Sequence, residues 1–191
     1  GTHHFLTQID HIDDPWGRKL AKLEFGTSTG RQRMVGWFDA VEKGNALRYG
    51  GFDQLVINKL DALTLDPSVP PELKICTGYK SADGSISYTV PRNEELRRSL
   101  QPVYKTLPGW TEDIQKIQSF YSLPKEAQLY VAEMLGCLVD AAFPDGLNPS
   151  CKLPEIRFIG VGPNPGEIIS DIPASRELLD LRKSLELSAI S

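Results

Sequence analysis

The run Asn58–Asp61, with the sequence Asn-Lys-Leu-Asp, carries side chains that could distinguish guanine from other bases. A fixed carboxylate such as that of Asp61 can accept hydrogen bonds from both N1–H and the 2-amino group of guanine, which makes a charge-assisted bidentate pair. Adenine has a lone pair at N1 and no 2-amino group, so the same carboxylate would repel it. The Lys59 stem can lie along the face of a base, and the Asn58 amide can reach a ring nitrogen or the neighbouring backbone. We interpret this run as a guanine-recognition element; the alternative is a helix cap at Asp61.

A second run, Gly26–Arg33, combines small residues with the guanidinium groups of Arg31 and Arg33. Small residues allow successive backbone N–H groups to turn towards one point, and guanidinium groups add forked cationic donors. This pattern predicts an anion-binding loop, with an ordinary turn as the alternative. A chain that carries both runs is typical of a nucleotide enzyme that also holds a small carboxylate.

The size and composition of the chain are those of a globular protein. Its 191 residues suffice for one domain that buries roughly 70% of its unfolded surface. The net charge of −4 argues against bulk nucleic-acid binding and against a basic membrane-binding surface. No apolar run approaches the roughly 20 residues of a membrane span, and no signal-peptide pattern opens the chain. We therefore expect a cytoplasmic protein that has neither nucleic acid nor membrane as a partner.

The cysteines and histidines do not form a recognisable metal or redox motif. Cys76, Cys137 and Cys151 include no CxxC pair, which favours reduced thiols over a disulfide framework or a zinc site. Cys137 falls on an apolar helical face, where a thiol behaves as a small hydrophobic group. The adjacent pair His3-His4 would point to opposite faces of an extended segment, so we expect no metal ligands in this chain.

Apolar periodicity and turn residues predict a mixture of strands and helices. The short apolar run Leu55–Ile57 indicates a buried strand whose carboxyl end presents Asn58–Asp61, the place where open α/β sheets bind ligands. Asp83-Gly84 indicates a hairpin turn. The other expected strands are 1–9, 73–79, 85–90, 103–107 and 156–161. One expected helix begins near Asp14, a second begins at Trp37 and is ended by Gly50-Gly51, and the others cover 93–100, 124–142 and 175–187. The class is α/β, a mixed sheet with flanking helices and an antiparallel hairpin.

An ordered set of motifs resembles the adenylosuccinate synthetase family. The segments are, in chain order, Phe5–Thr7, Glu24–Arg31, Gly36–Asp39, Lys59–Asp61, Leu107–Asp113 and Val161–Pro163. Each one is weak alone, but their common order over residues 1 to about 170 is specific. The resemblance implies the C-terminal part of a P-loop-NTPase-like adenylosuccinate synthetase fold over residues 1–170, followed by a helical extension over 171–191.

The resemblance also implies an activity and a set of ligands. Members of the family are GTP-dependent carbon–nitrogen ligases of purine (AMP) biosynthesis, which use GTP and Mg²⁺ to phosphorylate the 6-oxygen of inosine monophosphate (IMP). The amine of L-aspartate then displaces the phosphate to give adenylosuccinate. By similarity, the aspartate loop comprises Thr27, Ser28, Thr29, Gly30, Arg31, Gln32 and Arg33. Arg31 would also touch the ribose of IMP. The GTP-binding residues would be Arg33, Lys59, Leu60, Asp61, Gly160, Val161 and Gly162.

Several family elements have no counterpart in this sequence. The phosphate loop, the general-base Asp, the general-acid His and the magnesium ligands are expected upstream of Gly1, so we predict that the chain alone is inactive and needs the missing N-terminal portion as a partner. The family generally forms homodimers. Gly160 stands where a Ser is frequent, and Gln8 where an acidic residue is usual. The magnesium ion and GTP are thus expected cofactor and co-substrate of the assembled enzyme.

Three other functions compete with this interpretation. The chain could be a non-catalytic module of the same family that binds GTP or a carboxylate without turnover. A GTPase-type switch is disfavoured, because neither a phosphate loop nor an Asp-x-x-Gly element precedes Asn58. A sibling enzyme that adds aspartate to a guanine nucleotide is not distinguished by these residues. Gly160–Gly166 could equally be a simple proline-bounded loop.

Overall fold

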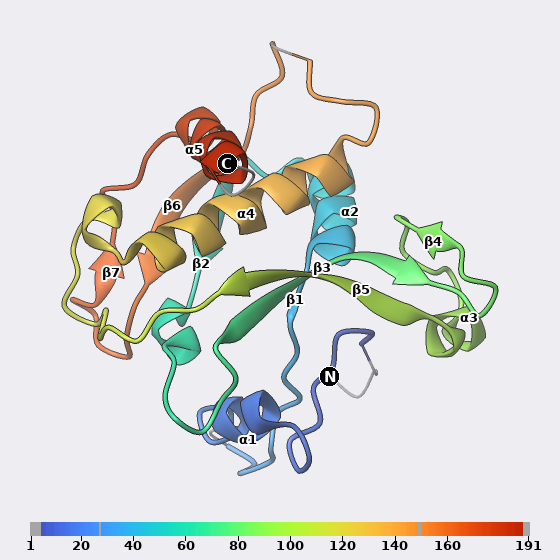
Figure 1. Cartoon of the computed structure of the whole chain (residues 1–191), viewed down its shortest axis with the longest axis horizontal. Helices are drawn as coiled ribbons and strands as arrows, with labels where there is room; N and C mark the ends of the chain where they lie inside the picture. The colour runs from blue at the N-terminus through green and yellow to red at the C-terminus, as the bar shows by residue number, and fades with distance from the viewer. Residues whose placement is uncertain (1–4, 27, 149, 189–191) are drawn as a thin grey trace.

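Two small sheets lie on either side of a long helix in the computed structural model, which describes residues 5–26, 28–148 and 150–188 (Figure 1). The first sheet is built on β3 (Glu72–Lys80), which pairs in parallel with β1 (Phe38–Asp39) and antiparallel with β4 (Ile86–Ser87) and β5 (Gln101–Pro108). The second sheet has the order β2-β6-β7. In it β2 (Gln54–Ile57) pairs in parallel with β6 (Glu155–Gly160), and β7 (Ile168–Ile169) is antiparallel. The predicted α/β class with mixed strand directions is confirmed.

The helices connect and cover these sheets. The longest, α4 (Lys125–Ala142), passes in front of β2 and β6 and above β3 and β5 in Figure 1, and it packs against its neighbours α2 and α5. Its buried residues include Ala127, Val131, Leu135 and Leu138, which recur at the predicted helical spacing. The other helices are α1 (Pro15–Ala21), α2 (Ala40–Gly50), α3 (Glu94–Ser99) and α5 (Ser175–Ser188), with the short 3-10 helices η1 (Leu60–Leu63) and η2 (Phe120–Ser122).

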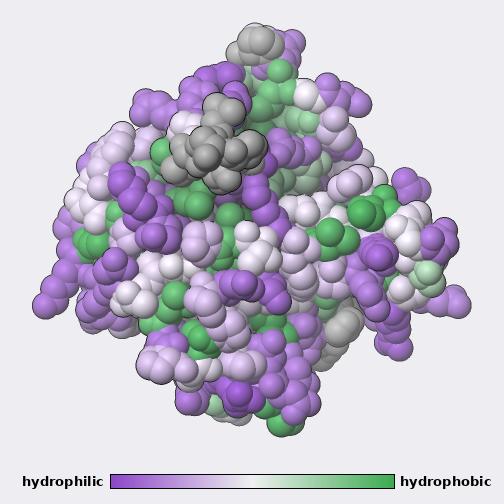
Figure 2. Space-filling model, viewed as in Figure 1, coloured by the Kyte–Doolittle hydropathy of each residue, from purple (hydrophilic) through white to green (hydrophobic). Residues whose placement is uncertain are grey.

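The C-terminal helix α5 shares the main hydrophobic core. Leu178 is fully buried in the same cluster as Ile156 of β6 and Val131 of α4. The Arg182 side chain donates to the buried carboxylate of Glu133 on α4 over 3.0 Å. The side of the molecule drawn in Figure 2, where α4 and α5 lie, is mostly hydrophilic, with hydrophobic residues in small separate patches. No helix among the described residues has the length and apolar character needed to cross a lipid bilayer.

Two predicted elements at the N-terminal end are wrong. The described part of the strand expected over 1–9, residues 5–9, holds only a single bridge between Gln8 and Gly36. The helix expected from Trp37 begins instead at Ala40. Phe38 and Asp39 are strand residues because they pair with Ile75 and Cys76 of β3, a long-range contact that local periodicity does not reveal. The hairpin at Asp83-Gly84 forms, but its second strand is only Ile86–Ser87.

Asp39 stabilises the junction between β1 and α2. Its Oδ1 accepts hydrogen bonds from the backbone N–H groups of Val41 (3.1 Å) and Glu42 (3.0 Å), and its Oδ2 accepts from the hydroxyl of Tyr79 (2.7 Å). Burial raises the pKa of this carboxyl, and the three hydrogen bonds oppose that rise. Asp39 therefore caps the helix and also ties it to the central strand β3.

Replacing Asp39 with Ala should lower the free energy of unfolding by about 2–3 kcal/mol. The change removes a helix cap and leaves the buried Tyr79 hydroxyl without its acceptor. Urea unfolding of the purified chain, followed by tryptophan fluorescence, measures the loss. Asn93→Ala is the matched control, because Asn93 caps α3 through the Leu96 N–H at an exposed site and should cost about 1 kcal/mol. Equal losses in the two variants would show that the Tyr79 contact contributes nothing.

Candidate functional site

The predicted guanine-binding residues meet at the carboxyl ends of two neighbouring strands. β2 and β6 run parallel, with Ile57 opposite Ile159, so Asn58–Asp61 and Gly160–Gly162 leave the sheet at the same edge. The two segments lie next to each other. A Cβ added to Gly160 would lie 3.4 Å from Oδ1 of Asn58 and 3.6 Å from the backbone nitrogen of Lys59. A Ser side chain at position 160 would therefore project towards Asn58. This edge is where parallel sheets bind ligands.

The backbone turns sharply at Lys59, directly after β2. Lys59 has φ 61°, the one non-glycine residue with positive φ in the described part of the chain, in a conformation that costs of order 1 kcal/mol for a side-chain-bearing residue. The turn sends the Lys59 side chain towards the Gly26–Arg33 loop and starts η1, which carries Leu60 and Asp61. Leu60 is buried in the core, so its side chain serves packing.

Asp61 has a carboxylate oxygen with an unused hydrogen-bonding capacity. Its Oδ1 is buried and has no hydrogen-bond partner among the described residues. The alternative role as a helix cap is wrong, because the cap position of η1 is Lys59 and no side chain caps this helix. A buried acceptor without a partner costs about 1–3 kcal/mol, and a ligand that donates a hydrogen bond would remove that cost.

The Gly26–Arg33 loop is a closed turn tied at its base. The Gly26 N–H donates to the Arg31 carbonyl (2.8 Å), and the Gly30 N–H donates to the Gly26 carbonyl (2.8 Å). Gly30 has φ 61°, which a residue without a Cβ adopts readily. The Gln32 amide donates to the Glu24 carbonyl (2.8 Å) and to that of Ala21 (3.0 Å), so it holds the base of the loop.

The tip of the loop faces solvent. Ser28, Thr29, Gly30 and Arg31 are exposed, which leaves the Arg31 guanidinium accessible to a ligand. Thr27, the first of the predicted aspartate-loop residues, lies outside the described residues, as do His3 and His4. The loop therefore presents short hydroxyl side chains and a cation on a backbone that is closed by its own hydrogen bonds.

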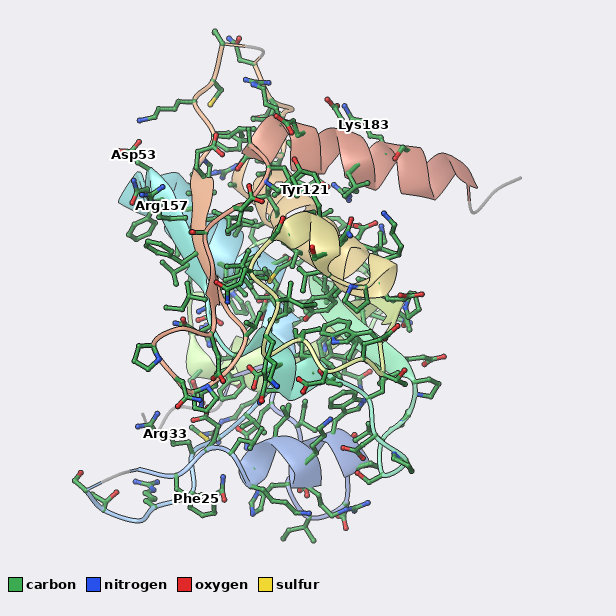
Figure 3. The ribbon with its side chains drawn as sticks, turned by 90° about the vertical axis from the view of Figure 1, so that its left-hand side faces the viewer. Phe25, Arg33, Asp53, Tyr121, Arg157 and Lys183 are labelled. Carbon is green, nitrogen blue, oxygen red and sulfur yellow. The ribbon has the colours of Figure 1, made fainter. Side chains whose placement is uncertain are left out.

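Glu24 joins the loop to the segment Asn58–Asp61. Its carboxylate forms an ion pair with Lys59 through Oε1 and lies 3.5 Å from Nη1 of Arg33 through Oε2. The Glu24 carbonyl also accepts a hydrogen bond from the Arg33 N–H (3.0 Å). Figure 3 shows Phe25 and Arg33 together at the loop, and Asp53, which precedes β2, at the opposite end of that strand. The carboxyl end of β2 and the arginine loop therefore share one side of the molecule.

A cavity of about 600 Å³ opens beside these segments. Glu24, Asn58 and Lys59 line it together with Met34 and Gly36. No residue of Gly26–Arg33 lines it, and neither does Asp61. The two segments are joined by the Glu24–Lys59 ion pair and not by a shared lining of this cavity. Sequence reasoning placed Glu24 in the segment Glu24–Arg31 but missed its ion pair with Lys59, because nothing local indicates that contact.

Trp110 and Cys137, which also lie in patterns noted in the sequence, are buried in the core. Trp110 is buried, and its indole N–H donates to the Thr64 hydroxyl over 3.1 Å. Cys137 is buried as predicted, and burial raises the pKa of its thiol to about 11. The described residues contain no group of three or more His, Cys, Asp or Glu side chains arranged to hold a metal ion.

Comparison with known proteins identifies the family. The model of the adenylosuccinate synthetase family matches residues 1–141. The chain belongs to the adenylosuccinate synthetase family. Curated adenylosuccinate synthetases that it resembles include that of Bacillus anthracis, 46% identical over 122 residues, and that of Acidothermus cellulolyticus, 36% identical over 171 residues.

The matches also define how much of an adenylosuccinate synthetase is represented. The matched segments cover 63% of this chain and 27% of the Bacillus anthracis protein, and 88% and 35% for the Acidothermus cellulolyticus protein. A solved structure of fully ligated adenylosuccinate synthetase from Plasmodium falciparum superposes with a TM-score of 0.71 at 28% identity, over 90% of this chain and 37% of that one. The chain thus has the fold of about a third of an adenylosuccinate synthetase.

Proposed function

We propose that this chain supplies the guanine- and aspartate-binding elements of an adenylosuccinate synthetase that couples GTP hydrolysis to the condensation of IMP with L-aspartate. The observation that carries the proposal is the Glu24 carboxylate, which joins Arg33 of the arginine loop to Lys59 of the guanine segment. Through this residue the proposed aspartate loop and the proposed guanine segment would be held next to each other. The proposal includes a cytoplasmic enzyme that acts as a homodimer.

At the nucleotide end of the cleft, Asp61 would accept hydrogen bonds from N1–H and the 2-amino group of guanine through its unpartnered carboxylate oxygen. The backbone of Gly160–Gly162, which adjoins Lys59, would cover the base from the other strand. The Lys59 stem would lie along the base while its ammonium stays paired with Glu24.

At the carboxylate end, the exposed guanidinium of Arg31 would hold a carboxylate of aspartate and approach the ribose of IMP. Arg33 lies 3.5 Å from Glu24, a loose contact for an ion pair. It would exchange this contact for the GTP phosphates, which carry more negative charge. These residues position ligands and neutralise charge, and they transfer no proton.

The proton-transfer groups and the magnesium ligands would come from the part of the family's chain that this sequence does not span. The described residues offer no carboxylate cluster suited to the ion. When bound in the complete enzyme, Mg²⁺ would neutralise phosphate charge during phosphoryl transfer. The second candidate is a module that binds GTP without catalysis. The same cleft supports it, and such a module would have neither the proton-transfer groups nor the magnesium ligands. Ligase activity in the presence of the remaining part of the enzyme distinguishes the two.

Replacing Arg31 with Leu in the assembled enzyme should raise the KM for aspartate about tenfold or more. The change removes a hydrogen bond between charged groups, which contributes about 1.5–3 kcal/mol. Initial rates of adenylosuccinate formation at varied aspartate measure it, and the KM for GTP should change less than the KM for aspartate. Arg92→Leu is the control, since Arg92 is exposed beside α3 and away from the cleft. An unchanged aspartate KM in the Arg31 variant would remove Arg31 from this role.

A further inference from the structure

The short helix that carries Asp61 does not fix the position of this residue by itself. η1 spans only Leu60–Leu63, and among the described residues no side chain caps it. Helices of the 3-10 type have poor hydrogen-bond geometry, and a single helical turn is unfavourable in isolation. η1 also starts at the positive φ of Lys59, which adds strain. The carboxylate of Asp61 therefore depends on groups outside η1 to hold it in one place.

Thr64, the residue that ends η1, makes three hydrogen bonds. Its N–H donates to the Asp61 carbonyl (3.1 Å), and its hydroxyl accepts from the indole N–H of Trp110 (3.1 Å). Its carbonyl accepts from the ammonium of Lys19 on α1. Trp110 is 1% exposed, so the core fixes its position. Lys19, in contrast, reaches Thr64 from a helix that is 45 residues away in sequence.

The surroundings of Lys19 hold its ammonium at Thr64. The Lys19 side chain is 17% exposed, and its Nζ lies 3.1 Å from Oδ2 of Asp66. Nζ also lies 5.0 Å from the centre of the Trp16 ring, a distance typical of a cation–π contact. A charged donor that is partly shielded from water forms a stronger hydrogen bond than a neutral one. Lys19 therefore restrains the carbonyl of Thr64.

One segment, from α1 to the base of the arginine loop, holds η1 at both ends. Glu24 pairs with Lys59 before η1, and Lys19 binds Thr64 after it. In Figure 1 the chain that leaves η1 passes beside α1 before it enters β3. Contacts on both sides of a four-residue helix restrict its movement more than either contact alone. The orientation of the Asp61 carboxylate thus depends on α1.

We propose that Lys19 is a positioning residue for guanine recognition, which holds η1 so that the Asp61 carboxylate can accept both hydrogen bonds of the guanine edge. This inference rests on the proposed function. A bidentate contact requires two donors and two acceptors in one geometry. A displaced carboxylate keeps only one hydrogen bond, which hypoxanthine provides equally well through its N1–H. Loss of Lys19 therefore reduces the preference for guanine over hypoxanthine, the base that lacks the 2-amino group.

Binding of GDP and IDP to the assembled enzyme tests this role. The two nucleotides differ only in the 2-amino group, and neither carries a γ-phosphoryl group to transfer. Calorimetric titrations with saturating IMP, which keeps IDP out of the IMP site, give the dissociation constant of IDP divided by that of GDP. Lys19→Met keeps an apolar side chain beside Trp16 and should lower this ratio about fivefold, which corresponds to roughly 1 kcal/mol, the value of one ordinary hydrogen bond.

Three further variants separate positioning from a general loss of stability. Arg18→Met is the matched control, because Arg18 lies on the same helix and donates to the carbonyls of Ile12 (2.7 Å) and Asp13 (3.1 Å), outside η1. It should leave the ratio unchanged. In an Asp61→Asn background, Lys19→Met should not lower the ratio further, since the carboxylate that it positions is absent. Asp66→Asn, an exposed change that weakens the ion pair of Lys19, should lower the ratio by a smaller factor.

The inference is overturned if Lys19→Met keeps the ratio of the unmodified enzyme, or if it lowers the ratio equally with and without Asp61. Should Lys19→Met fail to fold, an unchanged ratio in Asp66→Asn overturns the inference instead. The unmodified enzyme shows which proposal fails. If it binds GDP and IDP equally, guanine recognition by this chain is rejected together with the positioning role. If its preference for GDP survives Lys19→Met, only the positioning role is rejected.

Discussion

Replacing Glu133 with Ala is expected to lower the free energy of unfolding by about 3–5 kcal/mol. The Glu133 side chain is 2% exposed, and its two oxygens accept from Lys105 Nζ on β5 (2.7 Å) and from Arg182 Nε on α5 (3.0 Å). One buried carboxylate thus connects the central helix to a sheet and to the C-terminal helix. Its removal breaks two ion pairs of one buried carboxylate, while Arg182 keeps its second ion pair, with Asp140 (2.7 Å). Urea unfolding of the purified chain measures the loss.

Two comparisons separate this explanation from a simple loss of side-chain volume. Glu94→Ala removes an exposed ion pair with Arg98 (3.1 Å), which should change stability by less than about 0.5 kcal/mol. The triple replacement of Glu133, Lys105 and Arg182 with Met should recover most of the stability, since apolar groups of similar size need no buried ion pair. If the triple variant is as unstable as Glu133→Ala, lost packing and not the broken ion pairs explains the effect.

The elements that the sequence predicts well are those with a strong local pattern. α4 follows from apolar residues at the spacing of one helical face, and it begins one residue after the predicted start. β2 follows from the apolar run Leu55–Ile57, and the structure adds only Gln54. The prediction that this strand is buried is wrong, because Leu55 and Ile57 are only partly buried and Val56 is 56% exposed. β1 was not predictable, because two residues have no periodicity and their conformation depends on pairing with β3.

The same distinction holds for the candidate site. The meeting of Asn58–Asp61 with Gly160–Gly162 could be anticipated in part, since each segment follows an apolar strand and parallel strands end at one edge. The contact of the arginine loop with Lys59 could not, because it runs through Glu24, 35 residues away in sequence. Propensity and periodicity describe a residue's own element, whereas this contact depends on how α1 and β2 are placed in the tertiary structure.

Replacing Asp61 with Asn is expected to reduce GTP affinity by about 1.5–3 kcal/mol, or roughly 10–150-fold. The buried Oδ1 of Asp61 has no protein partner among the described residues, so a guanine N1–H or 2-amino group would be its hydrogen-bond donor. An Asn amide keeps the size of the side chain and replaces one acceptor by a donor, which opposes the guanine edge. Titration of GTP into the assembled enzyme, with calorimetric detection, measures the loss.

The same variant should bind xanthosine triphosphate more tightly than the unmodified protein does, because xanthine has an oxygen at position 2 that accepts from the Asn amide. This exchange of preference separates base recognition from general damage, since misfolding would weaken both nucleotides. Asp53→Asn is the control: Asp53 lies before the amino end of β2, in an exposed ion pair with Lys152 (2.8 Å), and should alter neither affinity. If Asp61→Asn leaves GTP affinity unchanged, the unpartnered Oδ1 of Asp61 does not bind guanine, and Asn58–Asp61 is not the guanine-recognition element.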